Sequence, residues 1–163
     1  MNKINYCWDT CVLIAWIREE ADKPLADISA VVEQIDDGRA NLILPVTCYS
    51  ELLESRFTPN QLKSIDEWMK RSNIVLANTT QIVAQKARDI RSKALMKKPH
   101  PVSIKQPDAI VMATAIVFDA DVLHTFDEKM LNLGGSEILE GLKVTLPMDI
   151  SGQRALFRKE QKT

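Results

Sequence analysis

Four acidic residues stand beside apolar runs of this sequence, where a charged side chain needs an explanation. Asp9 lies in the middle of the stretch NYCWDTCVLI, which is otherwise suited to burial. Glu51, Asp108 and Asp127 each lie next to another apolar segment. Carboxylate oxygens suit hard divalent cations such as Mg²⁺ and Mn²⁺, and these ions assist displacement at phosphoryl groups. The residue types therefore point to metal-assisted phosphoryl chemistry, provided that the fold brings the acids together.

The hydrophobic pattern predicts the elements that must position these acids. Short apolar runs predict buried strands at 4–8, 42–44, 74–76, 122–125 and 142–146. Helical spacing predicts helices over 10–20, 24–37, 48–55, 58–71, 80–96 and 108–118, with Thr47 as the cap of the third. Strands that lack a polar face and alternate with helices are typical of a parallel sheet covered on both sides, so we expect the α/β class.

Several of the polar residues are expected at one edge of this sheet. Right-handed crossovers place the carboxyl ends of parallel strands together, and ligands bind in open sheets at that edge. The residues predicted to lie there are Asp9, Thr10, Ser50, Glu51, Thr125 and Asp127. Asp108 precedes a strand, so it reaches the same edge only if the amino end of its helix points there. The spacing alone leaves that orientation open.

Each acid also has an explanation that involves no metal. Asp9 can cap the helix after it, Asp108 can complement a helix dipole, Glu51 can be a solvated helix residue, and Asp127 can form a turn. The case for a shared site is the joint placement. Two carboxylates ~4 Å apart repel by about 4 kcal/mol at an effective dielectric of ~20, so a cluster needs a cation to offset the cost.

Composition limits the other possibilities. The 163 residues carry a formal net charge of −1, so the chain is expected to fold as one domain and is no polycation. The three cysteines have no C-x-x-C spacing, which favours a reducing cytoplasm over a disulfide framework. With two histidines and five glycines, three-histidine zinc sites and glycine-rich phosphate loops are excluded. No apolar run is long enough to span a bilayer, and no secretory signal is evident.

A run of basic residues leads directly to Asp108. Lys97, Lys98 and Lys105 are its candidates for contacts with the backbone of RNA, which would weaken as salt rises. The alternative is an ordinary solvated helix face and loop. Among the tryptophans, Trp8 and Trp16 are assigned to the core, and Trp68, on a charged helix, is the better candidate for a partner surface.

At these motifs the sequence resembles the PIN-domain nucleases and, within them, the VapC-like ribonuclease toxins. The matching segments are WDTCVLI, VTCYSELLES and QPDAIVMATAIVFDADVLHTFDEKM, which together extend from Ile4 to about Met130. The resemblance implies a three-layer α/β/α domain with a central parallel sheet over residues 1–150, followed by a polar tail at 151–163. It also implies that the amino end of the helix that carries Asp108 points to the site.

The resemblance further implies an endoribonuclease that uses Mg²⁺ or Mn²⁺ and is the toxin of a toxin–antitoxin pair. Asp9, Glu51, Asp108 and Asp127 would then be the catalytic and metal-binding acids, with Thr10, Ser50 and Thr125 as supporting hydroxyls. RNA is the expected substrate, a small antitoxin the expected protein partner, and a homodimer the expected assembly. The sequence departs from the family at Cys11, where many relatives have Asn or Ser, and in its extra length at 21–37 and in the tail.

Two other classes of protein compete with this interpretation. A non-catalytic PIN-like module that binds RNA or protein is the main alternative, although it would have no reason to retain four mutually repelling acids. A phosphatase of the dehalogenase type needs a second Asp two residues after the first, and Cys11 occupies that position. A receiver domain needs paired acids before the phosphorylated strand end, which are missing.

Overall fold

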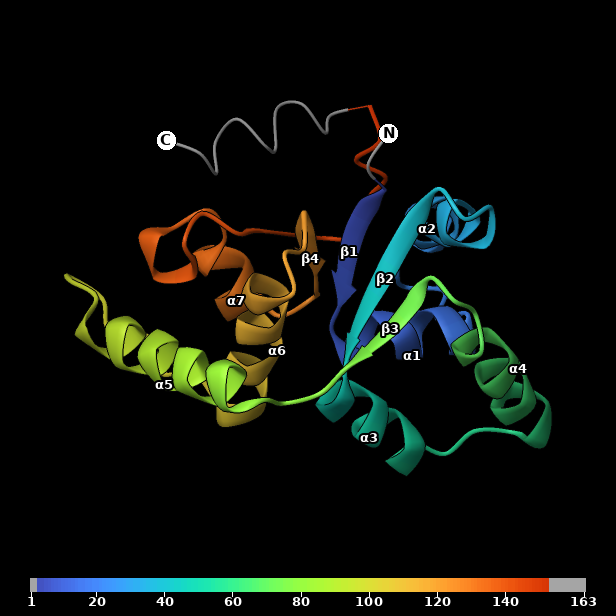
Figure 1. The fold of residues 1–163 in the computed structure, drawn as a ribbon, viewed down its shortest axis with the longest axis horizontal. Helices are drawn as coiled ribbons and strands as arrows, with labels where there is room; N and C mark the ends of the chain where they lie inside the picture. Colours follow the sequence, from blue (N-terminus) through green and yellow to red (C-terminus); the bar gives the residue numbers. More distant parts are fainter. Residues whose placement is uncertain (1–2, 153–163) are drawn as a thin grey trace.

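The computed structural model describes residues 3–152, and the tail predicted at 151–163 lies almost entirely outside this range. Within it, five parallel strands form one sheet in the order β3-β2-β1-β4-β5 (Figure 1). The strands are β1 Ile4–Trp8, β2 Ala40–Pro45, β3 Ile74–Ala77, β4 Val122–His124 and β5 Lys143–Thr145. All five occur where the apolar runs predicted them, so the predicted parallel sheet is confirmed.

Helices cover both faces of this sheet. They are α1 Thr10–Arg18, α2 Leu25–Asp36, α3 Val46–Glu54, α4 Pro59–Met69, α5 Gln81–Met96, α6 Gln106–Val117 and α7 Glu128–Leu133, with a 3₁₀ turn η1 at Glu137–Leu139. The chain moves from β1 to β3 in one direction and then crosses back to β4 and β5. With right-handed crossovers, α1 to α4 therefore cover one face and α5 to α7 the other. Figure 1 shows these two groups on opposite sides of the strands, which gives the predicted three-layer α/β/α domain.

Local sequence signals explain most helix ends. Thr58 forms a capping box with Gln61 at the start of α4, and the Thr80 hydroxyl accepts the Val83 N–H at the start of α5. The predicted cap of α3 is wrong. Pro45 occupies the N-cap position, so Thr47 lies within the first turn and its buried Oγ1 has no hydrogen-bond partner among the described residues.

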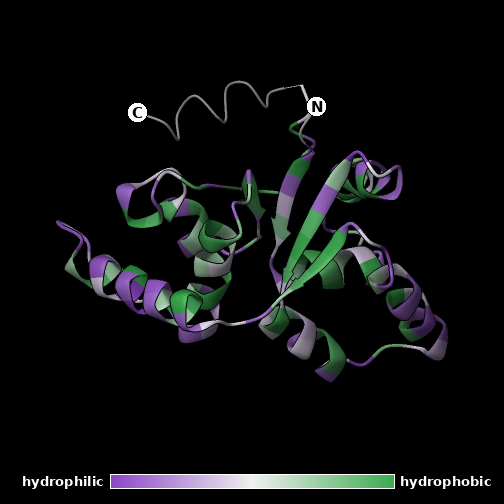
Figure 2. Ribbon diagram, in the orientation of Figure 1, coloured by the Kyte–Doolittle hydropathy of each residue, from purple (hydrophilic) through white to green (hydrophobic). Residues whose placement is uncertain are grey.

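The core lies where the sheet meets the two helical layers. Figure 2 shows apolar residues along the central strands and polar residues on the outer faces of α4 and α5. Trp8 is fully buried, and Trp16 packs against the core as predicted. The prediction for Trp68 is wrong: only 6% of this residue is exposed, because its ring packs on Trp16 at a centroid distance of 4.6 Å. The Trp68 indole N–H also donates to the Asp36 carboxylate. Trp68 is therefore a core residue, although most of α4 is polar.

None of the helices in the described part of the chain is long and apolar enough to cross a membrane.

Candidate active site

The predicted acids lie near the carboxyl ends of β1 and β4, two neighbouring strands from which the chain continues in opposite directions across the sheet. β1 and β4 are neighbours, although the chain continues from β1 towards β2 on one side and from β4 towards β5 on the other. Connections that diverge in this way leave a crevice at the carboxyl ends of the two strands. The Asp9 N–H donates to the His124 carbonyl at 3.1 Å, which extends the β1–β4 pairing to the first residue of the site.

Hydrogen bonds tie Asp9 to the loop after β4. The Asp9 carboxylate accepts the Thr10 N–H at 2.8 Å with one oxygen and the Thr125 hydroxyl at 2.8 Å with the other. The same Thr125 hydroxyl accepts the Asp127 N–H at 3.0 Å. Asp127 in turn caps α7 by accepting the Met130 N–H at 3.0 Å. Asp9 and Asp127 therefore have structural roles as caps, and both also lie on one hydrogen-bonded path.

Glu51 is joined to the same path from the other side. It lies on α3, and its carboxylate accepts a hydrogen bond from the hydroxyl of Thr10, the residue after Asp9. Thr10 is buried, whereas Glu51 is exposed, so the hydroxyl holds an exposed carboxylate beside the end of β1. Both supporting threonines thus contact the acids with which the sequence grouped them.

Cys11 is the site residue that sequence reasoning missed. Its thiol donates to the Asp9 carboxylate at 3.4 Å, accepts the Phe126 N–H at 3.4 Å, and lies 3.7 Å from the Thr125 hydroxyl. Burial and the negative charge of Asp9 raise the pKa of the thiol to about 12, so it stays protonated and remains a donor. Its position two residues after Asp9 is the signal that could have indicated this contact.

Asp108 lies in the first turn of α6, which packs against α3. Burial raises the pKa of its carboxyl group, and the negative charges of Asp127, Asp9 and Glu51 raise it further, while Lys105 lowers it. All three other acids are thus close enough to act on Asp108 electrostatically. The orientation that the spacing left open is settled: the amino end of α6 points to the same region as the strand ends.

The carboxylates do not form a ready-made metal site. Within residues 3–152, no three acid, histidine or cysteine side chains are grouped closely enough to hold an ion as they stand. Asp9 and Glu51 are instead turned towards hydroxyl and thiol donors. The chemistry of the donor set still suits a hard divalent cation, because all four acids supply oxygen. The negative charges of the other three acids add to burial in raising the pKa of Asp108, and a cation would offset that repulsion.

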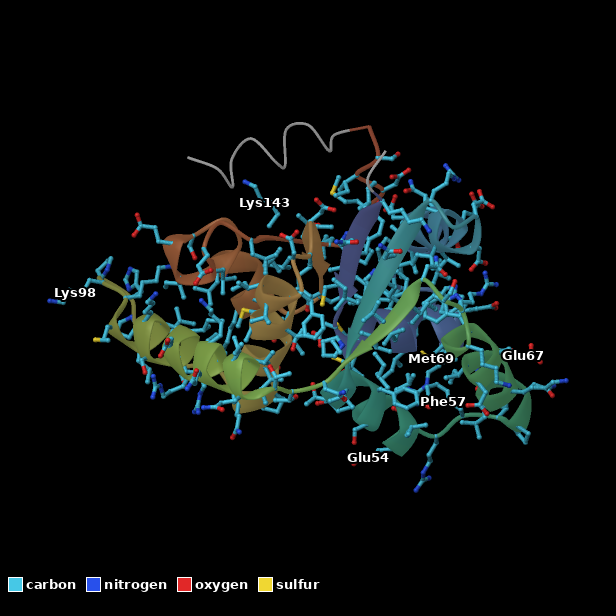
Figure 3. All side chains as sticks on the ribbon, viewed as in Figure 1. Glu54, Phe57, Glu67, Met69, Lys98 and Lys143 are labelled. Carbon is cyan, nitrogen blue, oxygen red and sulfur yellow. The ribbon has the colours of Figure 1, made fainter. Side chains whose placement is uncertain are left out.

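The remaining predicted residues differ in how close they lie to the acids. Ser50 is exposed on α3 beside Glu51, while Glu54 points away into solvent at the end of the same helix (Figure 3). Lys105 is the N-cap residue of α6 and acts on Asp108. Lys98, in contrast, lies beyond the far tip of α5, on the opposite side of the molecule from α4 (Figure 3). Lys97, the residue before Lys98, is the C-cap residue of α5.

A comparison with protein families decides the ancestry of this arrangement. The family model of the PIN domain matches residues 6–135, which include all four acids. The chain belongs to the PIN domain family. Among curated proteins, none matches the sequence closely enough to count as a relative.

Solved structures resemble this PIN domain in fold. The crystal structure of VapBC2 from Rickettsia felis, bound to a DNA fragment from their promoter, matches with a TM-score of 0.63 and 15% identity, covering 88% of this chain and 98% of that one. The structure of FitAcB from Neisseria gonorrhoeae matches with a TM-score of 0.57 and 19% identity, covering 87% and 97%. In both cases the match covers almost the whole of the other chain, and at this level of identity the likeness is one of fold.

Proposed function

We propose that this PIN domain is a metal-dependent endoribonuclease and the toxin of a toxin–antitoxin pair. The observation that supports it most is the continuous hydrogen-bonded path Glu51–Thr10–Asp9–Thr125–Asp127 at the crevice of the sheet. Asp108 adds a fourth carboxylate from the opposite helical layer. A structural capping role accounts for Asp9 and Asp127 separately, but it gives no reason for four acids to share one region.

In the proposed reaction, Asp9, Asp108 and Asp127 would hold Mg²⁺ or Mn²⁺, with Glu51 as a fourth ligand or as the group that orients the attacking water. A divalent cation there would lower the pKa of water and offset the charge on the departing 3′-oxygen. Thr10 and Thr125 fix the carboxylates of Glu51 and Asp9, and Cys11 adds a third donor to Asp9. Lys105, at the start of α6, is suited to contact a substrate phosphate.

The partners follow from family and fold. The likeness to the VapBC2 and FitAcB structures supports a small antitoxin protein as the partner of this chain, and RNA as its substrate follows from the proposed reaction. A homodimer is the assembly that we propose on the same grounds.

The decisive experiment replaces Asp108 with Asn. Asp108→Asn should lower Mg²⁺-dependent RNA cleavage by more than about 100-fold, because a metal ligand is lost. Mutating a residue that only hydrogen-bonds to a metal ligand already lowers metal affinity or activity by about 10- to 100-fold. Metal-free thermal stability should stay constant or rise slightly, because repulsion among the acids is relieved. Cleavage is measured on structured RNA with Mg²⁺ and with EDTA. Asp66→Asn, an exposed acid on α4, is the matched control. Full activity of Asp108→Asn would refute the proposed role.

The competing function is a PIN module that binds RNA or protein without catalysis. It is favoured by one observation: the acids of the described residues do not stand as a preformed ion site. Calorimetric titration with Mg²⁺ and Mn²⁺ separates the two functions. Binding that is lost in Asp108→Asn supports the nuclease, and an absence of any binding by the wild-type protein supports the module.

A further inference from the structure

An open pocket of about 260 Å³ lies beside the acids, between α3 and the start of α6. It is lined by Thr47, Ser50, Glu51, Gln106, Pro107 and Ile110. Glu51 belongs both to this pocket and to the hydrogen-bonded path of the candidate active site. Pro107, on the opposite wall, is followed directly by Asp108. A group bound in the pocket would therefore lie next to whatever the acids act on.

The walls of the pocket combine flat apolar surface with hydrogen-bonding groups. Pro107 and Ile110 supply the apolar surface, and most of the exposed lining is apolar. Ser50 and Gln106 are exposed side chains that can each donate and accept hydrogen bonds, while Glu51 can only accept. The carboxylates disfavour a phosphate here by charge repulsion. A nucleobase matches these walls, because it is uncharged, planar and apolar on its faces and carries donors and acceptors on its edges.

We propose that this pocket binds the base of a nucleotide that flanks the scissile phosphate. This inference rests on the proposed nuclease function and defines its substrate more closely. The volume equals that of about nine water molecules at ~30 Å³ each, so the pocket has room for a base. A base can enter only when it is unpaired and unstacked, so the substrate is single-stranded RNA or a loop.

A larger hollow of about 420 Å³ lies between the end of α1 and α4, with Trp16 and Ile65 among its lining residues. None of the predicted site residues lines it, so it does not share the argument from adjacency to the acids.

Two substitutions test the pocket from different directions. Ile110→Trp fills it, and Gln106→Ala removes its amide while leaving the space open. Ile82→Trp and Gln85→Ala, at exposed positions of α5 outside the pocket, are the matched controls. The substrates are single-stranded RNA oligonucleotides with one mapped cleavage position, the same oligonucleotides with an abasic site on either side of it, and the corresponding duplexes. Cleavage rates are measured with Mg²⁺, and equilibrium binding is measured in EDTA.

The wild-type protein should cleave the single strand in preference to the duplex. An abasic site on one side of the mapped position should lower kcat/KM by about tenfold, the size of effect expected when a single base loses its contacts. In Ile110→Trp the intact RNA should fall to the abasic rate, so the difference disappears. Gln106→Ala should reduce the difference in kcat/KM between intact and abasic RNA, and the two control variants should retain that difference.

Three outcomes would overturn the proposal, and they separate it from the nuclease assignment. If the wild-type protein cleaves but abasic sites on both sides have no effect, the nuclease stands and the base pocket is rejected. If no RNA is cleaved with Mg²⁺, the nuclease fails, and binding in EDTA then decides the pocket: equal affinity for intact and abasic RNA rejects it. If Ile110→Trp and Gln106→Ala change neither cleavage nor binding, the pocket takes no base, and a protein partner is its remaining occupant.

Discussion

His124 is a buried titratable side chain that the proposed chemistry does not use. It is the last residue of β4, its ring is fully buried, and its Nδ1 accepts the Trp8 indole N–H at 3.1 Å. The neutral ring therefore carries its proton on Nε2, which has no hydrogen-bond partner among the described residues. Burial lowers the pKa of His124 to about 3, because a charged imidazole would be desolvated there. Protonation would also remove the acceptor that holds Trp8.

This histidine should make the protein sensitive to acid. Between about pH 6.5, its ordinary pKa, and the lowered folded value, the unfolded chain binds a proton that the folded protein does not. The free energy of unfolding should therefore be highest above pH 6.5 and fall as the pH is lowered, by about 2 kcal/mol at about pH 5. His124→Asn keeps an acceptor near Trp8 but does not titrate, so this part of the pH dependence of the free energy of unfolding should be lost. Urea unfolding of both proteins across the pH range checks it, and parallel stability curves would contradict it.

The turn between α7 and β5 shows how closely two neighbouring elements are packed. Gly134 ends α7, and a Cβ atom at this position would lie 2.9 Å from the Val144 nitrogen and 3.0 Å from its carbonyl oxygen. These contacts are with the backbone of β5, and moving β5 away from α7 would disturb its pairing with β4. Only glycine allows the helix end to approach the strand this closely.

Replacing Gly134 with Ala should therefore destabilise the domain. The added methyl group forces β5 away from α7, and overpacking of this kind costs about 1–3 kcal/mol. Gly152→Ala is the matched control, because a Cβ atom there would meet nothing within 4 Å. Chemical denaturation of both variants measures the effect. Equal stability of the two would mean that the edge strand adjusts without cost.

The elements also show what the sequence could and could not predict. The strands were predictable because each is a short apolar run, and α4 and α5 because Thr58 and Thr80 are strong caps. The short helix α7 was not predicted because its six residues give too little periodicity, so the metal-free explanation offered for Asp127 was a turn rather than the helix cap that the structure has. The prediction for Trp68 was wrong because a mostly polar helix pattern does not show which of its residues packs against another helix, here against Trp16 of α1. Topology predicted that Asp9, Glu51 and Asp127 lie near one crevice, and the resemblance added Asp108. The directions in which the carboxylates of Glu51 and Asp9 point were not predictable, because they depend on hydroxyl partners distant in sequence.

At the scale of the whole molecule, the basic run extends from the site to a distant tip. Lys105 is close enough to Asp108 to lower the pKa of its carboxyl group. Lys98 lies beyond the far end of α5, with Lys97 beside it in sequence (Figure 3). Two further basic residues that precede them on α5 are engaged within the protein, since Lys86 pairs with Glu140 and Arg91 donates to the Ile104 carbonyl. RNA bound at the acids would reach Lys97 and Lys98 only if it followed the surface along the layer of α5 and α6.

The length of the RNA should therefore decide which lysines contribute to binding. Each lost phosphate contact should reduce the slope of log affinity against log salt by about 0.7 for a single strand. With a long RNA, Lys97→Gln/Lys98→Gln should lower the slope by about 1.4, and adding Lys105→Gln should bring the loss to about 2. With an oligonucleotide just long enough to fill the site, only Lys105→Gln should matter. Lys63→Gln/Lys70→Gln, two exposed lysines at α4 and its end, control for net charge. Equal effects of the two double variants at both lengths would show that the basic run is a solvated surface, and that RNA leaves the site in another direction.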